Sequence, residues 1–353
     1  MTYLFLYLQF ILGSLLFNEP DTVKISFFGD LMQHKEQLSS ALKRGANPNQ
    51  SSSYDYSCYF KNIATILQDA DYSVVNMETT FPAPPFSGYP VFGSPASLAK
   101  ETKEAGFDLF LSANNHICDR KSSGISGAIN LFDTLNVDYI GIYRDSDHEE
   151  KSYPLIKEIS GIKVAFLNYT YGTNGLKTPT PFIVKRLDSA TIKRDIFRAT
   201  LYKPDVIIAC IHWGEEYKLK NNSEQLKWKS LFNRNGVKII IGSHPHVPQN
   251  FEFTESGDSI SDITLFSLGN FISNMSAPFT RIGLCVTLKL KKCNNGKVTI
   301  LKPDYEYLWT TRPGEFEKGY SVIRIKELLD KPERFKVRDS YDKMKHYYSI
   351  LTK

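Results

Sequence analysis

Five segments of the chain carry carboxylate, amide or imidazole side chains where a predicted strand ends. These side chains belong to Asp30, Glu78, Asn114-Asn115-His116, His212 and His244-Pro245-His246. Because ligand sites in open α/β sheets form at the carboxyl ends of the strands, we expect the five segments to converge in space. Their oxygen and nitrogen ligands, without a thiolate, suit Mn, Fe or Zn. The spacing therefore predicts a metal site.

Each segment taken alone has an ordinary structural explanation. Asp30 is a typical turn residue, Asn114 and Asn115 tolerate left-handed backbone, and a single His212 can be packed in a core. The His244-to-His246 segment is more specific, because its central proline restricts the backbone and holds both imidazoles on an extended stretch. The equivalent position of all five segments after strands favours one shared site over five separate coincidences.

The elements that must position these residues alternate between strand and helix. Strands are predicted at 23–28, 72–77, 109–113, 137–142, 206–211 and 238–241, and helices at 54–70, 97–105, 125–135, 189–201 and 223–233. Ser160-Gly161 predicts a hairpin between strands 155–159 and 163–167. Beyond Pro248 the predicted strands are 251–253, 264–267, 284–290 and 297–301. This order predicts one layered α/β domain over residues 23–310, followed by a polar, partly helical extension over 311–353.

Composition excludes several classes of protein. The 353 residues include 43 Lys and Arg against 38 Asp and Glu, a net charge of +5 without a basic cluster, so we expect no nucleic-acid partner. The chain has five cysteines, an odd number, and no two of them form a C-x-x-C motif. A disulfide framework or a cysteine-ligated zinc finger is therefore not expected.

The first residues predict export. Residues 2–17 are apolar except Gln9 and Ser14, which is short for a spanning helix but the right length for the core of a signal peptide. A basic start and a clear cleavage site are absent from this stretch. We interpret residues 1–22 as a signal peptide or membrane anchor. A start codon assigned too early and a buried first element remain the alternatives.

Six motifs occur in order along most of the chain, from about residue 23 to 308. They are Phe28-Gly29-Asp30-Leu31-Met32, Val75-Asn76-Met77-Glu78, Ala113-Asn114-Asn115-His116 with Asp119, His212-Trp213-Gly214-Glu215-Glu216-Tyr217, Gly242-Ser243-His244-Pro245-His246-Val247 and Phe266-Ser267-Leu268-Gly269-Asn270-Phe271. The set resembles the CapA-type capsule-synthesis (poly-γ-glutamate biosynthesis) proteins of the calcineurin-like metallophosphoesterase superfamily.

This resemblance implies a four-layer αββα sandwich with one or two divalent metal ions (Mn, Zn or Fe) between its layers. It implies that Asp30 and His246 bind a first metal, that Glu78 bridges both metals, and that Asn115, His212 and His244 complete the second. The chain departs from the wider superfamily at Met32, where a D-x-H motif often supplies a further histidine. His34 is a candidate replacement ligand, although a surface histidine is the simpler interpretation.

The resemblance also implies roles around the metals. His116 would protonate the leaving oxygen, with Asp119 as its supporting partner. Trp213, Tyr217 and Asn270 are expected at the substrate. Glu216 is a candidate for orienting an imidazole.

The resulting hypothesis is a metal-dependent, phosphoesterase-like hydrolase linked to the synthesis of a capsule or another cell-surface polymer. Its partners would be an anionic polymer or phosphoester substrate and capsule-synthesis membrane proteins, and it would work in the cell envelope, outside the cytoplasm. The alternative is a non-catalytic, metal-containing component of a complex that assembles or exports capsule polymer. Attack of the same metal-activated water on an amide or peptide bond is a third possibility.

Overall fold

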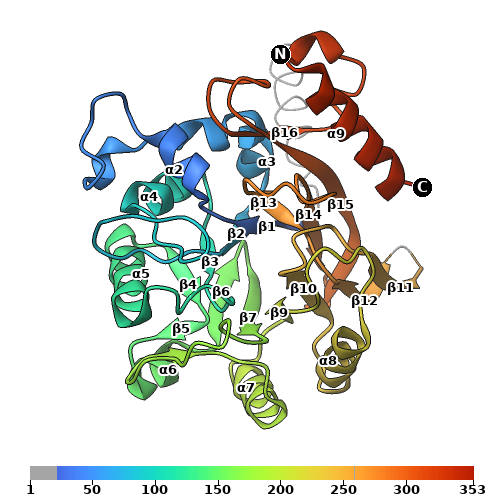
Figure 1. Cartoon of the computed structure of the whole chain (residues 1–353). Coiled ribbons are helices and arrows are strands. Elements are labelled where there is room, and N and C mark those ends of the chain that lie inside the picture. Colours follow the sequence, from blue (N-terminus) through green and yellow to red (C-terminus); the bar gives the residue numbers. More distant parts are fainter. Residues whose placement is uncertain (1–21, 258) are drawn as a thin grey trace, which may run out of the picture.

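A large mixed β-sheet forms the centre of the computed structural model, which describes residues 22–257 and 259–353 (Figure 1). One half of the sheet contains, in spatial order, β4 (Asp138–Ile140), β3 (Leu109–Leu111), β2 (Tyr72–Met77), β1 (Thr22–Leu31) and β14 (Ile282–Lys292). The other half contains β15 (Val298–Thr311), β12 (Ser259–Leu265), β10 (Ile239–Ser243), β9 (Val206–His212), β7 (Ile162–Thr170) and β6 (Leu155–Ile159). Strands β1 to β4 run parallel, as do β7, β9, β10 and β12.

The remaining described elements surround this sheet. Three strands pair outside the main order: β11 (Phe251–Ser256), β13 (Asn270–Ile272) and β16 (Ser321–Arg324). Strands β5 (Ile142–Tyr143) and β8 (Ile183–Val184) form a separate pair. The helices are α2 (Lys35–Ala41), α3 (Ala64–Asp69), α4 (Ala96–Glu104), α5 (Lys121–Leu135), α6 (Ser146–Ser152), α7 (Ser189–Leu201), α8 (Ser223–Arg234) and α9 (Arg338–Leu351).

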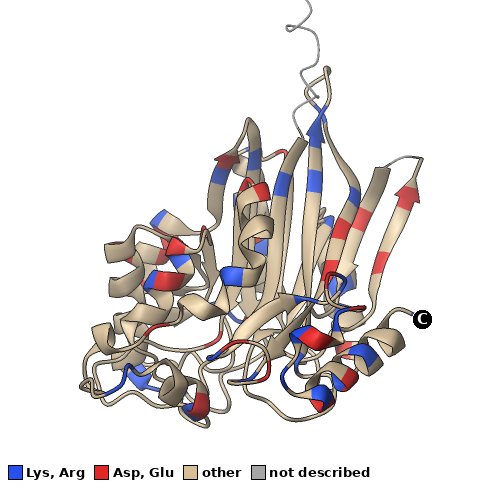
Figure 2. Cartoon of the chain, turned by 90° about the horizontal axis from the view of Figure 1, so that it is seen from above, with Lys and Arg blue, Asp and Glu red and all other residues tan. Residues whose placement is uncertain are grey.

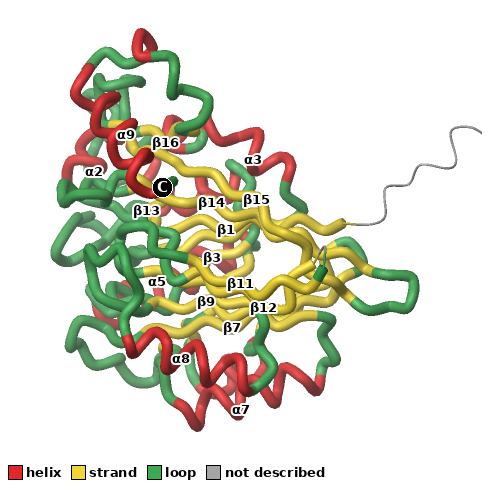
Figure 3. The backbone as a smooth tube through the Cα atoms, turned by 90° about the vertical axis from the view of Figure 1, so that its right-hand side faces the viewer, coloured by secondary structure: helices red, strands yellow, loops and turns green. Residues whose placement is uncertain are grey.

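The two halves of the sheet face each other across a shared core, as the stacked strands in Figure 3 show. The ring of Tyr72 on β2 stacks on that of Phe166 on β7, with 5.7 Å between their centroids. Side chains alternate between the two faces of a strand, so Phe110 of β3 points outward and packs 5.2 Å from Phe132 of α5. On the other side, Phe232 of α8 lies 5.9 Å from Tyr169 of β7.

These contacts confirm the predicted α/β class and its order of helix, sheet, sheet and helix. Hydrogen bonds nevertheless join the two halves into one continuous sheet. The connection is β15, which pairs with β14 along most of its length and with β12 near its start. The hairpin predicted at Ser160-Gly161 is present between β6 and β7.

The helix predicted over 54–70 is wrong for most of its length. The chain instead makes short 3₁₀ turns at Ser51–Ser53, Ser57–Tyr59 and Lys61–Ile63, and only α3 is helical. Tyr54, Tyr56, Tyr59 and Phe60 are all buried, although they would point in several directions from a helix. Burial of these aromatic rings therefore outweighs the helical pattern of the sequence.

Residues 311–353 continue the same folded unit. Strand β16 pairs with β15, and α9 buries Tyr341 and Met344 in the shared core. The Arg281 guanidinium connects this region to β14, since it bonds to the Glu315 carboxylate and to the Ser340 hydroxyl.

The segment predicted to direct export, residues 1–22, lies outside the described residues apart from Thr22, which begins β1. Within the described ranges, no helix is both long and apolar enough to cross a membrane. Basic and acidic residues are intermingled over the strands and helices (Figure 2).

Candidate metal centre

Strand ends from both halves of the sheet meet at one pole and bring the predicted ligands together. Asp30 lies near the end of β1, in register with Asn76 of β2 and Asn270 of β13. Glu78 directly follows β2, and His212 is the last residue of β9. The turn after β10 continues into the two remaining histidines. Convergence of these strand ends, which the sequence predicts, is present in the structure.

Five ligand-type side chains form two overlapping groups, and all five are buried. Ligand atoms of Asp30, Glu78 and His212 lie within 4.8 Å of one another, and so do those of Glu78, His244 and His246. Glu78 belongs to both groups, as a residue between two cations would. The grouping differs from the expected one, in which Asp30 pairs with His246, although Oδ2 of Asp30 is only 3.3 Å from Nδ1 of His246.

Several buried polar atoms at this centre lack a protein partner. Among the described residues, neither carboxylate oxygen of Glu78 has a hydrogen-bond partner, and Nδ1 of His244 has none. Burial raises the pKa of the Glu78 carboxyl well above its usual range, and the nearby charge of Asp30 raises it further. Burial also lowers the pKa of His212 and of His244, which keeps both imidazoles neutral. Buried, unpaired oxygen and nitrogen donors of this kind fit a divalent cation.

Amide side chains orient the ligands. The Asn76 amide donates to Oδ1 of Asp30 (2.7 Å) and lies 3.2 Å from Nδ1 of His212. Oδ1 of Asn270 lies 3.0 Å from Nδ1 of His246. The Asn76 contacts fix Asp30 and the ring of His212, and the Asn270 contact fixes the ring of His246 and leaves its Nε2 for a metal. Asn270 is buried and held between His246 and the Thr280 carbonyl, so it positions the His246 ring.

Asn115 lies beside His212, with which it was expected to share a metal. Its Oδ1 is 2.9 Å from Nε2 of His212, and its amide nitrogen donates to Oδ1 of Asn174 (3.2 Å). The Asn174 contact fixes the side chain with its oxygen toward the histidine. Asn115 can therefore contribute one neutral oxygen ligand.

The turn that carries the last two histidines is strained. His244 has φ 99° and His246 has φ 59°, values that side-chain-bearing residues seldom adopt. Such conformations persist only where the surrounding structure enforces them, and they cluster at functional sites. Here the strain turns both imidazoles toward Glu78.

His116 lies beside the ligands without joining either group. Its Nδ1 is 2.8 Å from Oδ2 of Asp119, which also accepts a bond from the backbone N–H of Phe92 (2.8 Å). The ring of Phe92 meets the His116 ring edge-on at 4.6 Å. These contacts fix the imidazole and leave Nε2 as the nitrogen free for chemistry.

Of the remaining residues predicted near the substrate or the histidines, one lies in the core and two are exposed beside the metal centre. Trp213 is buried in the core, and its indole N–H donates to the Phe266 carbonyl (2.9 Å). Tyr217 is 45% exposed, and its ring lies 6.3 Å from that of His246. Glu216 is exposed beside it.

Tyr171 is a site residue that the sequence reasoning missed. Its ring is 45% exposed and lies 4.5 Å from the ring of His244. It directly follows β7, which extends to Thr170, whereas the predicted strand ended at 167. The same strand-end rule would have found Tyr171 if that strand had been drawn three residues longer.

His34 lies outside both groups of candidate ligands and is not a simple surface residue. It is partly buried at the start of α2, with Nδ1 3.1 Å from Oε1 of Gln37 and its ring 5.4 Å from that of Phe92. Burial lowers its pKa to about 4. His34 belongs to neither group of candidate ligands among the described residues.

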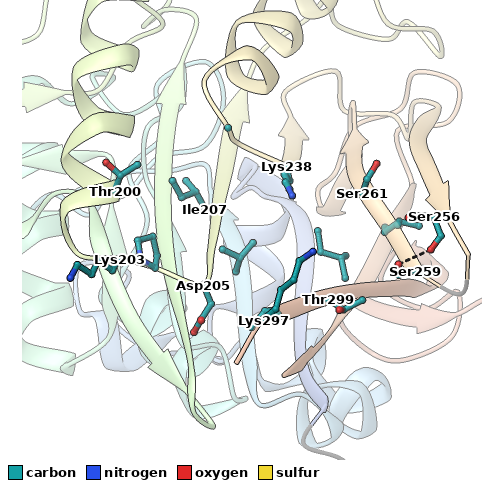
Figure 4. Close-up of a pocket in the computed structure, with 16 residues that line it drawn as sticks. Thr200, Lys203, Asp205, Ile207, Lys238, Ser256, Ser259, Ser261, Lys297 and Thr299 are labelled. Carbon is teal, nitrogen blue, oxygen red and sulfur yellow. Dashed lines mark hydrogen bonds between the residues drawn. The ribbon is translucent and has the colours of Figure 1, made fainter. Parts of the chain in front are cut away.

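A separate pocket of about 370 Å³ lies at the opposite ends of the strands (Figure 4). Its lining includes Val206 at the start of β9, Lys238 just before β10, and Lys297. Because β9 and β10 run from this pocket to the histidines, the pocket and the metal centre lie at opposite edges of the sheet.

The sequence matches the family described as bacterial capsule synthesis protein PGA_cap over residues 24–275. The chain belongs to this family. It is 25% identical to a capsule biosynthesis protein CapA of Bacillus anthracis over 285 residues, which are 78% of this chain and 65% of that protein. It is 26% identical to a PGA biosynthesis protein CapA of Bacillus subtilis (strain 168) over 80% of this chain and 72% of that one. The chain thus spans just under two thirds of the first relative's length.

The solved structures that are similar to this chain share less sequence identity with it than the two capsule proteins do. One is a NAD nucleotidase of Haemophilus influenzae, with a TM-score of 0.48 and 11% identity over 95% of this chain and 61% of that one. Another is a calcineurin-like phosphoesterase, YfkN, of Bacillus subtilis, with a TM-score of 0.45 and 14% identity over 81% and 91% of the two chains.

Proposed function

We propose that this member of the capsule synthesis family is a metal-dependent hydrolase of phosphoesters that acts in the synthesis of a cell-surface polymer. The proposal rests on the position of Glu78, whose two buried oxygens have no hydrogen-bond partner among the described residues and which belongs to both groups of histidine and carboxylate ligands. A carboxylate so placed can bridge two cations. Divalent ions held there would polarise a phosphoryl oxygen and activate water.

The chain supplies the remaining parts of the reaction. Asp119 holds Nδ1 of His116, so Nε2 can donate a proton to the oxygen that leaves. Phe92 packs against this imidazole and limits the water around it. Asn76 and Asn270 keep the carboxylate and imidazole ligands in place before substrate arrives.

The proposal places the protein at the cell envelope, which is consistent with the names of its relatives, and gives it a phosphoester-bearing polymer or precursor as substrate. Membrane proteins of capsule synthesis are its proposed partners.

Turnover of simple phosphoesters tests the proposal. Purified protein is stripped of metal, reloaded with Mn, Zn or Fe, and assayed with a phosphodiester and a phosphomonoester. We expect metal-dependent hydrolysis. Substitution His116→Ala should lower kcat by about 10² or more while the bound metal is retained, because the proton donor is lost and the ligands are not.

A matched variant, His346→Ala, removes an exposed histidine on α9 and should keep full turnover. Bound metal without hydrolysis of either ester would contradict the proposal and favour the non-catalytic role in polymer assembly. Equal loss of metal and turnover in His116→Ala would make this residue a ligand instead of a proton donor.

A further inference from the structure

Three exposed tyrosines each lie near a histidine, two of them near the candidate ligands His244 and His246 and the third near His34. Tyr171 and Tyr217 are each 45% exposed, and Tyr89 is 68% exposed. Their rings lie 4.5 Å from His244, 6.3 Å from His246 and 6.4 Å from His34, respectively. An exposed tyrosine offers a ligand a flat apolar face and a hydroxyl group at little entropic cost, because few bonds must be fixed.

A groove of about 560 Å³ begins at Tyr89 and lies between α2 and the loop of residues 85–91. Its apolar lining includes Tyr54, Pro85, Phe86, Pro90 and Val91. The groove is close to the metal centre, because the Tyr89 ring lies 6.1 Å from that of Phe92, which contacts His116. Tyr89 therefore places one end of the groove beside the ring that packs on His116.

The charge of the groove indicates what kind of chain fits. Of the described residues that line it, Lys35 alone carries a formal charge. On the rim beside Tyr217, Glu215 pairs with Lys218 (3.7 Å), and Glu216 is exposed. A polyglutamate strand carries a negative charge on every residue and would meet one lysine in the groove. Complementary charge is what such a polyanion requires, and the groove does not provide it.

A glycan fits these features better. Sugar rings have apolar C–H faces that pack on aromatic rings and hydroxyl groups that bond to tyrosine and carboxylate oxygens. We propose that Tyr89, Tyr171 and Tyr217, together with the groove, bind an uncharged glycan portion of the substrate. The position of its phosphoester at the metals rests on the proposed function, whereas binding of the glycan portion does not.

Calorimetric binding to the full, metal-loaded protein tests this inference. The probes are uncharged tetrasaccharides built from glucose, galactose or N-acetylglucosamine, and an oligomer of γ-linked glutamate. We expect at least one tetrasaccharide to bind and Tyr89→Ala to weaken its binding by about tenfold. The control Tyr202→Ala removes a 49% exposed tyrosine at the end of α7 and should leave the affinity unchanged.

Three results would overturn the inference: no tetrasaccharide binds, binding is the same in Tyr89→Ala, or the glutamate oligomer is the probe whose affinity depends on Tyr89. Turnover is not measured in this experiment. Glycan binding in a protein that fails the phosphoester assay would therefore contradict the proposed function alone, and hydrolysis without glycan binding would contradict only this inference.

Discussion

At the scale of single residues, the centre depends on polar groups that are buried at the expense of stability. Glu78 and His244 have buried atoms without a hydrogen-bond partner among the described residues, a condition that normally lowers stability. A cation bound at these atoms would remove that penalty. The residue types and their places after strands were readable from the sequence, but their hydrogen bonds were not. Asn270 illustrates this difference, since its motif is visible whereas its bond to His246 depends on the pairing of β13 with β1.

His34 predicts a specific pH dependence of stability. Its pKa is about 4 in the folded chain against 6.5 for a free histidine, because burial disfavours the charged form. The unfolded chain therefore binds the proton first, and the folded state loses stability as the pH falls from 6.5 toward 4. At pH 5 this contribution amounts to about 2 kcal/mol.

The substitution His34→Gln should remove that loss. Denaturant unfolding of wild type and variant at pH 7.5 and pH 5 measures it, as the difference between the two pH values within each protein. A variant that loses as much stability on acidification as wild type would show that His34 does not titrate in this range.

At the scale of elements, the strand ends position the chemistry, and close backbone contacts fix them. Most strands and helices were predictable because their apolar periodicity is regular. The segment 54–70 was not, since its aromatic rings pack in several directions. Tyr171 was missed for a related reason, because the end of a buried strand has no polar marker in the sequence.

The substitution Gly242→Ala tests how far the metal centre depends on the position of β10. A Cβ atom there would lie 2.0 Å from the Phe266 carbonyl oxygen and 2.6 Å from Nε1 of Trp213, so Gly242→Ala must displace the strand that leads to His244. We expect a lower melting temperature and weaker metal binding, both measured by thermal unfolding with and without added Mn. Gly172→Ala is the control, because a Cβ at that position would meet nothing within 4 Å. Equal melting temperatures for the two variants would contradict the close packing of β10.

At the scale of the whole molecule, the C-terminal segment is part of the core. The sequence of residues 311–353 is mostly polar. Its contribution to the core could not be predicted from the sequence, because α9 buries only a narrow face. Met344 lies on that face and is fully buried with β14 and β15 residues in the shared core.

Substitution Met344→Ala should lower the free energy of unfolding by about 2–5 kcal/mol, the usual cost of a large-to-small change in a core. Lys345→Ala, the next residue and exposed, should change it by about 0.5 kcal/mol or less. Denaturant titration of both variants measures this difference. If Met344→Ala is as stable as Lys345→Ala, α9 does not pack on the core as the structure shows.

The central claim, that five strand ends build a metal centre around Glu78, is tested most directly by metal content. Elemental analysis of wild type after dialysis against Mn, Zn or Fe should find one or two divalent ions per chain. Glu78→Ala and His244→Ala should each lose most of this metal, and His346→Ala should keep it. A wild-type protein without bound metal, or the same metal content in Glu78→Ala as in wild type, would contradict the claim.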